Sequence, residues 1–359
     1  MNLRTPGPTP LPPGVREALS RDMVNHRGPE ARDLMRRVTV GLKAVFQTEN
    51  DVLVLTGSGT GGLEAAVVNL FSPGERILSV TIGVFGDRFA KIAERFGVEV
   101  LRLSFPLGTA ADPKGIAARL EEDPSITSVL VTHNETSTAV TNDLEVIARV
   151  VKAAGRLLVV DAISSLGGID LKTDAWGCDV VITGSQKAFM IPPGLAMISM
   201  SELAWRKSAE ARLPRFYWDL AAARKSLQQK SSTPWTPALG LIFALDVALE
   251  MMAKEGLPAI FERHRRVAEF CRRGLKAAGW ELFPEERWAS NTVTAVRMPE
   301  GMEAKRVSTT LRDRDGIVVA GGQGELEGKI LRVGHLGYVD VPDLEPVVEA
   351  FRKIRSEAG

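Results

Sequence analysis

Short apolar runs alternate with longer amphipathic stretches through roughly the first two thirds of the chain. Short runs of aliphatic residues are typical of strands buried on both faces, as in a parallel sheet that is covered by helices. Seven such runs stand out, at residues 52–55, 76–80, 98–103, 128–132, 157–161, 179–183 and 195–200. They predict an α/β fold with a mostly parallel, seven-stranded sheet.

Helical periodicity fills the intervals between these runs. Residues 61–70, 88–96 and 144–154 each place apolar side chains three and four positions apart, which predicts helices that pack on the sheet. The run at 195–200 follows the run at 179–183 too closely for a helical crossover, which needs about a dozen or more residues. We therefore expect this last strand to be antiparallel to its neighbour.

The same reading divides the chain into three parts. Residues 1–20 form a Pro-rich N-terminal arm, residues 21–255 a large domain, and residues 256–359 a small α+β domain. Amphipathic helices are expected at 239–254 and 257–278, on either side of the boundary between the domains. In the small domain, strands are expected at 292–296, 317–320 and 329–333, with a closing helix at 344–354.

Composition narrows the possible partners to small molecules. The 45 Lys and Arg residues nearly balance the 44 Asp and Glu residues, so no basic surface for nucleic acid or for an anionic membrane is indicated. The first fifteen residues lack the apolar core of a signal peptide, and no apolar run is long enough to span a bilayer, so we expect a soluble, cytoplasmic protein. Cys178, Cys271 and the four histidines fit no metal-ligand spacing, and no metal is expected.

A Gly-rich turn lies between the first predicted strand and the first helix. Residues 55–64, Leu-Thr-Gly-Ser-Gly-Thr-Gly-Gly-Leu-Glu, place free backbone N–H groups at a helix N-terminus, where a phosphate is favoured. Gly57, Gly59 and Gly62 also satisfy the GxGxxG pattern of dinucleotide-binding proteins. However, the acidic residue that such a fold places after the next strand is absent, since residues 80–85 read Val-Thr-Ile-Gly-Val-Phe. A turn that only permits tight packing is the remaining alternative.

Two further strands end in residues that can carry chemistry. Asp161 ends the run at 157–161, where a carboxylate can pair with the protonated nitrogen of a pyridine ring, although such an Asp is also a common helix cap. Lys187 follows the run at 179–183 and precedes Ala-Phe-Met-Ile-Pro-Pro-Gly. An amine among apolar neighbours and near a cofactor cation should have a lowered pKa, which suits it to form a Schiff base, and a solvated surface lysine is the alternative.

A phosphate turn, a strand-end Asp and a strand-end Lys occur in this order on successive elements of one predicted sheet. In this combination the sequence resembles the class V aminotransferases of fold type I, which use pyridoxal 5′-phosphate (PLP). It is most similar to the alanine–glyoxylate and serine–pyruvate group, whose members also bear the names aspartate aminotransferase and soluble hydrogenase small subunit. The likeness runs from Thr5-Pro-Gly-Pro-Thr to residues 329–337, Lys-Ile-Leu-Arg-Val-Gly-His-Leu-Gly.

The resemblance implies a role for each matching residue. Lys187 would hold the cofactor as a Schiff base and Asp161 would pair with its ring nitrogen. Cofactor contacts are further implied for Ser58, Gly59, Thr60 and Gln186 at the phosphate, Phe85 against the ring, and Thr136 at the 3′-oxygen. Substrate contacts are implied for Arg332, which would bind the α-carboxylate, and for Gly7. Thr236, or Thr233 if the alignment slips, would reach the phosphate of the neighbouring subunit in a homodimer.

The expected activity is therefore transfer of an amino group from alanine or serine to glyoxylate or pyruvate. Aspartate is the alternative donor, and it would need a second cation, for which Arg27 or His335 is a candidate. A cysteine desulfurase, a nicotinamide-dependent dehydrogenase and a non-catalytic subunit of a larger complex are the competing interpretations. The desulfurase would need a mobile thiol, which neither cysteine is placed to supply.

Overall fold

The computed structural model describes residues 1–357 and is built around a mixed, seven-stranded sheet with strand order β2-β10-β9-β8-β5-β3-β4. The strands are β2 (Val52–Thr56), β3 (Arg76–Thr81), β4 (Glu99–Ser104), β5 (Ser128–Thr132), β8 (Leu157–Asp161), β9 (Val180–Gly184) and β10 (Leu195–Met200). All seven predicted strands are present, and no strand end differs from the predicted one by more than one residue. The predicted fold class is confirmed.

One strand runs against the others, as the short connection predicts. β10 is antiparallel to both β2 and β9, whereas β9, β8, β5, β3 and β4 are mutually parallel. Parallel strands bring their carboxyl ends to one edge of the sheet, so Asp161 at the end of β8 lies beside the turn that follows β9.

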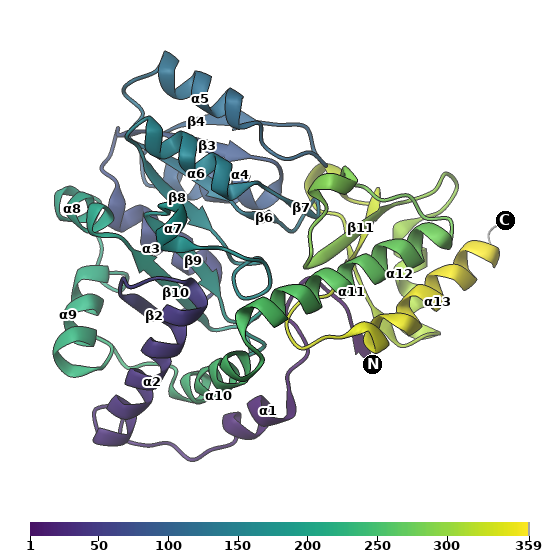
Figure 1. Cartoon of the computed structure of the whole chain (residues 1–359), viewed down its shortest axis with the longest axis horizontal. Helices are drawn as coiled ribbons and strands as arrows, with labels where there is room; N and C mark the ends of the chain where they lie inside the picture. The colour runs from purple at the N-terminus through teal and green to yellow at the C-terminus, as the bar shows by residue number, and fades with distance from the viewer. Residues whose placement is uncertain (358–359) are drawn as a thin grey trace.

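Helices cover both faces of the sheet (Figure 1). Alternate strand residues point to opposite sides, so Leu158 and Val160 belong to one apolar core and Leu157 and Val159 to the other. One face is covered by α1 (Pro13–Leu19), α2 (Pro29–Phe46), α5 (Pro113–Glu122), α6 (Leu144–Ala153) and α10 (Leu239–Glu255). The other is covered by α3 (Gly59–Leu70), α4 (Val84–Arg95), α8 (Glu202–Glu210) and α9 (Leu220–Lys230). The short β6 (Asn134–Glu135), β7 (Val140–Thr141) and α7 (Thr173–Trp176) lie in the connections.

The C-terminal third forms a second layer of structure with its own core. Its antiparallel sheet consists of β11 (Val293–Arg297), β14 (Ile330–Gly334) and β13 (Ala320–Gly321). The long α11 (Leu257–Ala277) runs from the large sheet to this part in Figure 1, and it packs beside α13 (Val341–Glu357). α12 (Ala304–Asp313) and two short 3-10 turns, Glu286–Trp288 and Gly324–Leu326, complete it. We keep 21–255 and 256–359 as a proposed division into domains.

The prediction of a single strand at 317–320 is wrong, because two short strands take its place. β12 (Ile317–Val318) pairs in parallel with β1 (Asn2–Leu3) of the N-terminal arm, whereas β13 pairs with β14. The apolar pattern of a strand does not specify which strand pairs with it, so the sequence does not show that the pairing partner changes at Val319. The proposed arm 1–20 thus contains a strand that lies against the C-terminal part, followed by α1.

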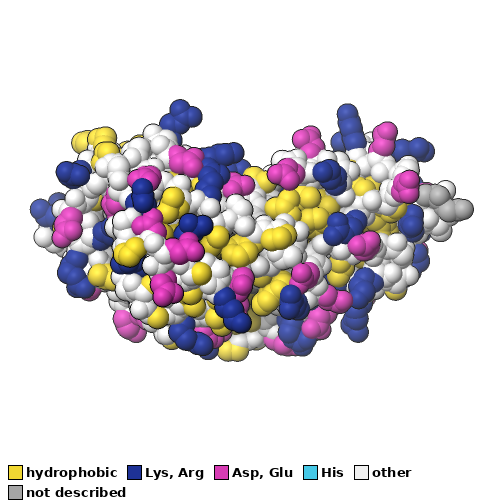
Figure 2. Space-filling model, turned by 90° about the horizontal axis from the view of Figure 1, so that it is seen from above, with side chains coloured by type: hydrophobic (Ala, Val, Ile, Leu, Met, Phe, Trp, Pro, Cys, Tyr) yellow, Lys and Arg dark blue, Asp and Glu magenta, His cyan; other side chains and the backbone are white. Residues whose placement is uncertain are grey.

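Charges of both signs are mixed on one face of the molecule. Figure 2 shows Lys and Arg side chains interspersed with Asp and Glu side chains over the face that it presents. None of the helices in the described chain is both long and apolar enough to cross a membrane.

Candidate active site

A small cavity at the carboxyl edge of the large sheet brings most of the predicted site residues together. Its volume is about 90 Å³. The predicted residues that line it are Ser58, Gly59, Thr60, Phe85, Thr136, Asp161, Gln186 and Lys187. Five lining residues were not singled out from the sequence, namely Leu63, Arg88, Asn134, Ile163 and Ser164. The site therefore combines residues from five separate segments of the chain.

Lys187 lies in the turn after β9 and is 8% exposed. Its Nζ donates a hydrogen bond to the carbonyl oxygen of Pro6, and its own carbonyl oxygen accepts one from Thr9 Oγ1 at 3.2 Å. Burial lowers the pKa of the Lys187 amine to about 8, with a further contribution from the positive charge of Arg332. At pH 7 about a tenth of this amine is therefore neutral, far more than for a lysine with the ordinary pKa, as a nucleophilic lysine requires.

The predicted Gly7 lies directly against the lysine. Its φ of +124° lies in the region that favours glycine, and a Cβ atom at this position would lie 2.7 Å from Lys187 Nζ. The N-terminal arm thus forms part of the wall around the amine.

Asp161 is buried at the end of β8. Its Oδ1 accepts a hydrogen bond from the backbone N–H of Ile163 at 3.0 Å, and Oδ2 lies 3.4 Å from Thr132 Oγ1. Burial raises the pKa of the Asp161 carboxyl to about 7, and the nearby Glu135 carboxylate raises it further. A cationic partner would stabilise the ionised form of this buried carboxyl and lower its pKa.

The N-terminus of α3 is open toward the cavity. Ser58 occupies the N-cap position but makes no capping hydrogen bond with its side chain. At Gly59, a Cβ atom would lie 2.5 Å from Ile163 Cδ1, so only glycine lets the helix approach this closely. Gln186 Oε1 is buried and has no hydrogen-bond partner among the described residues. Open N–H groups are what a phosphate or another anionic group of a ligand would satisfy, whereas the Gln186 oxygen, an acceptor, would be satisfied by a ligand hydroxyl or another donor.

The N-terminus of α4 is closed, in contrast, by the segment 135–137. The Glu135 carboxylate accepts hydrogen bonds from the N–H groups of Phe85 and Gly86, each at 3.1 Å, and Ser137 Oγ accepts one from Val84 N–H at 3.0 Å. Ser137 also donates to Glu135 from its own N–H at 3.0 Å. The carboxylate therefore holds the turn from which the Phe85 ring extends into the cavity. Sequence reasoning missed Glu135, whose only signal is an acid within a polar segment directly after a buried strand.

Arg332 comes from β14 and reaches the large sheet. Its Nε donates to the carbonyl oxygen of Gly321 at 2.9 Å and its Nη1 to that of Thr136 at 3.0 Å. Burial lowers the pKa of this guanidinium to about 10, and the nearby Glu135 carboxylate opposes that shift. Arg332 does not line the cavity itself, but it is bonded to Thr136, which does.

Comparison with known proteins accounts for this arrangement. The profile of the family described as aminotransferase class-V matches residues 14–329. The chain belongs to the class-V aminotransferase family. A Synechococcus sp. protein named soluble hydrogenase, small subunit, is 44% identical over 99% of this chain and 93% of its own. The L-aspartate–glyoxylate aminotransferase of Paracoccus denitrificans is 35% identical over 92% of this chain and 85% of its own.

Solved structures agree with this assignment. The crystal structure of an alanine–glyoxylate aminotransferase from Nostoc sp. matches with a TM-score of 0.95 at 32% identity, and the match covers 98% of this chain and 94% of that one. As a class-V aminotransferase, the protein moves an amino group between an amino acid and a 2-oxo acid. The family implies PLP as the cofactor. The resemblance stated from the sequence is confirmed, and the dehydrogenase interpretation is set aside.

Thr233 and Thr236 lie outside this aminotransferase cavity. Both line a separate pocket that also includes Thr56 and Trp218. Thr233 Oγ1 donates to the carbonyl oxygen of Trp235 at 2.6 Å, whereas Thr236 is exposed. Within one subunit, neither hydroxyl takes part in the site that contains Lys187.

The two candidates for a second cation are engaged elsewhere. Arg27 donates to Ser232 Oγ at 2.9 Å and to the carbonyl oxygens of Thr233 and Pro234, so it holds the loop that leads to Thr236. His335 is fully buried with Nε2 2.8 Å from Thr294 Oγ1, and burial lowers its pKa to about 3. Arg27 and His335 are both absent from the lining of the cavity.

His133 and the two cysteines are buried. Burial lowers the pKa of His133 to about 4, and its ring lies edge-on to that of Trp176. Burial raises the pKa of the thiols of Cys178 and Cys271 to about 12, which argues against a desulfurase. Within residues 1–357, His, Cys, Asp and Glu side chains do not gather into a group of three or more that could hold a metal ion.

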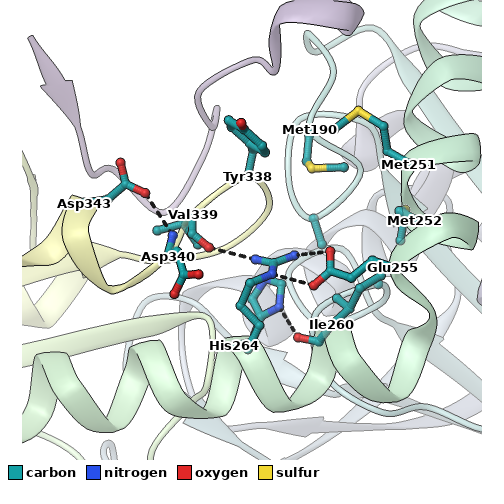
Figure 3. A pocket seen from close by; sticks show the side chains of 13 residues that line it. Met190, Met251, Met252, Glu255, Ile260, His264, Tyr338, Val339, Asp340 and Asp343 are labelled. Atoms are coloured by element: carbon teal, nitrogen blue, oxygen red, sulfur yellow. Dashed lines mark hydrogen bonds and ion pairs between the residues drawn. The ribbon is translucent and has the colours of Figure 1, made fainter.

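A larger cavity of about 410 Å³ lies behind the Lys187 turn (Figure 3). Figure 3 shows Met190, Met251 and Met252 on one side of it and Asp340 and Asp343 on the other. The side chains of α11 that line it are engaged with the protein itself. Arg263 pairs with Glu255 and donates to the carbonyl oxygens of residues 337 and 339, and His264 Nε2 accepts a hydrogen bond from residue 337 N–H. The cavity thus lies between the Lys187 turn and α10 on one side and α11 and residues 338–343 on the other.

Proposed function

We propose that this class-V aminotransferase uses PLP attached to Lys187 to transfer the amino group of alanine or serine to glyoxylate or pyruvate. One observation carries the proposal. The amine of Lys187 and the carboxyl of Asp161, both buried, line the same small cavity as the open N-terminus of α3. An amine, an acid and an anion site are the three features that hold PLP in enzymes of this class.

The residues present fit the cofactor. The open N–H groups of α3 at Ser58, Gly59 and Thr60, together with the side-chain NH₂ group of Gln186, would bind its phosphate. Asp161 would bind the protonated ring nitrogen, which supplies the cation that its buried carboxyl lacks. Phe85 would lie against the ring, and Thr136 would contact the 3′-oxygen. When bound, PLP supplies an electron-withdrawing ring that stabilises negative charge on the substrate's α-carbon.

The protein's own groups account for the proton transfers and for substrate orientation. The Lys187 amine, with its pKa lowered to about 8, can accept a proton from the substrate's α-carbon and return it. The guanidinium of Arg332 is held by Gly321 and Thr136 and would bind the α-carboxylate. The arm around Pro6 and Gly7 covers the amine and helps to exclude water.

We propose that the active enzyme is a homodimer in which Thr236 reaches the phosphate of the neighbouring subunit. Thr236 is preferred to Thr233 because the Thr233 hydroxyl is already bonded to the carbonyl oxygen of Trp235. Arg27 would position this loop through its bonds to residues 232–234. The exposed ring of Phe216 stacks on the partly buried ring of Trp235, with centroids 4.8 Å apart, and is available for burial in such an interface.

Half-reactions with single donors test the proposal. Alanine, serine, aspartate or glutamate is added to purified protein reconstituted with PLP, without any oxo acid, and the visible absorbance of the cofactor is followed. We expect alanine or serine to abolish the absorbance and glyoxylate or pyruvate to restore it, whereas Lys187→Ala should be inactive with every donor. Protein that fails to bind PLP, or that no donor converts, would refute the proposed activity. Conversion by aspartate alone would overturn the preference for small donors.

A further inference from the structure

Arg88 is a cation in the active-site cavity to which neither the sequence nor the family resemblance assigned a role. It lies on α4, one turn after Phe85, and lines the cavity together with Lys187. Its guanidinium carbon lies 4.7 Å from the centre of the Phe85 ring, and this cation–π contact holds it in place. Its charge contributes, after burial and Arg332, to the lowered pKa of the Lys187 amine.

The guanidinium of Arg88 is unpaired among the described residues. Its neighbour in sequence, Asp87, pairs instead with Arg102, which also forms a bidentate contact with Glu94. No hydrogen bond or ion pair to Arg88 is found within residues 1–357. A guanidinium has five N–H donors, and in a half-buried site their natural partner is an anionic group of a ligand.

The cations of the site lie on two different elements. Arg332 comes from β14 and donates hydrogen bonds to the carbonyl oxygens of Gly321 and Thr136. Arg88 comes from α4 and donates none within residues 1–357. Alanine and serine each carry one carboxylate, so they satisfy only one of the two guanidinium groups. A donor with two carboxylates satisfies both.

We propose that Arg88 forms a second anion subsite, which binds the side-chain carboxylate of a short dicarboxylic amino donor of the aspartate type. The inference rests on the proposed function and extends its donor range. Phosphate is the other anion in such a site, but the open N-terminus of α3 already offers N–H donors to it. α4 differs because its N-terminal N–H groups are occupied by Glu135, and of its two residues in the cavity lining, Phe85 and Arg88, only Arg88 has side-chain N–H donors.

Substitution of Arg88 tests the subsite in the holoenzyme. Arg88→Gln keeps a polar side chain without the charge, Arg88→Lys keeps the charge without the bidentate fork, and Arg95→Gln removes a charge from the exposed last turn of the same helix. For Arg88→Gln we expect KM for aspartate to rise about tenfold or more, and kcat/KM to fall at least about fivefold further for aspartate than for alanine, since only aspartate loses a carboxylate contact. Arg88→Lys should lie between wild type and Arg88→Gln, and Arg95→Gln should match wild type.

Binding to the apoprotein gives a readout that is independent of turnover. By calorimetry, we expect succinate to bind more tightly than propionate to wild-type protein, and Arg88→Gln to remove this difference. Equal losses with aspartate and alanine would overturn the proposal, and so would a loss of PLP affinity without a change in donor preference, since Arg88 would then serve the phosphate. Wild-type turnover of alanine without any of aspartate would also overturn it and leave the proposed function standing. Absence of turnover with every donor would refute the proposed function itself.

Discussion

The carboxylate of Glu135 accepts a 3.1 Å hydrogen bond from the backbone N–H of Phe85, which links the segment after β5 to the first turn of α4. Glu135 is fully buried and also accepts from Gly86 N–H, Ser137 N–H and Ser137 Oγ. Burial raises the pKa of this carboxyl, whereas these hydrogen bonds lower it. Since every one of these contacts is donated to Glu135, the carboxylate is the form that the site is built to hold.

Glu135→Gln should therefore destabilise the protein. The amide would direct its NH₂ group at N–H donors and leave buried groups unpaired, at a cost of about 1–3 kcal/mol in the free energy of unfolding. Chemical denaturation of the apoprotein measures this change. The exposed Glu145→Gln, which removes an i,i+4 pair with Arg149, is the control and should change stability by less than about 0.5 kcal/mol. An unchanged midpoint for Glu135→Gln would contradict the capping role.

The reactivity of the Lys187 amine should follow pH with a midpoint near 8. Its pKa is lowered to about 8, so the neutral, reactive form rises as pH increases through that value, well below the usual lysine range near 10.4. Competitive acylation of the apoprotein, with mass spectrometry of the Lys187 peptide, gives the midpoint. Arg332→Gln removes a positive charge and should raise it, whereas Asp161→Asn removes a negative charge and should lower it. A midpoint near 10 in wild-type protein would contradict the burial argument.

Gly59→Ala should weaken PLP binding through a contact with Ile163. The added Cβ would lie 2.5 Å from Ile163 Cδ1, which forces the side chain or the helix N-terminus to move. Ile163→Val removes that Cδ1 atom, so the double variant should recover part of the affinity lost in Gly59→Ala. Equilibrium titration with PLP compares the four proteins. Identical affinities for wild type and Gly59→Ala would show that the approach of α3 to Ile163 is unimportant for the cofactor.

A mixture of two inactive variants tests whether Thr236 acts across the dimer. Lys187→Ala removes the amine from its own site, and Thr236→Val would remove the hydroxyl from the neighbouring site. A hybrid dimer then contains one intact site, so unfolding and refolding an equal mixture should restore about a quarter of wild-type activity. The separate variants, treated in the same way, give the background. Failure of the mixture to exceed that background, with hybrids present by mass, would place Thr236 in its own subunit's site or outside any site.

The sequence pattern predicts those features of the structure that depend on residues close together in the chain. The apolar runs place the seven strands of the large sheet, because a strand buried on both faces needs aliphatic side chains at successive positions. The Gly-rich turn, Asp161 and Lys187 are identifiable for the same reason, since each directly follows or ends such a strand. The antiparallel course of β10 follows from the length of the connection alone.

Tertiary structure decides what depends on partners distant in sequence. Glu135 caps α4 only because β5 lies beside β3 in the sheet, and the order of strands cannot be read from any single run. The division of the predicted strand 317–320 is set by β1, more than 300 residues away. Arg88 becomes a cation of the site because Asp87 is taken by Arg102, so its free charge is a property of the folded chain. The sequence by itself predicted the seven-stranded sheet and singled out Lys187 and Asp161 as candidates. The packing of the folded chain determined which of the other charged side chains are unpaired and can bind a ligand.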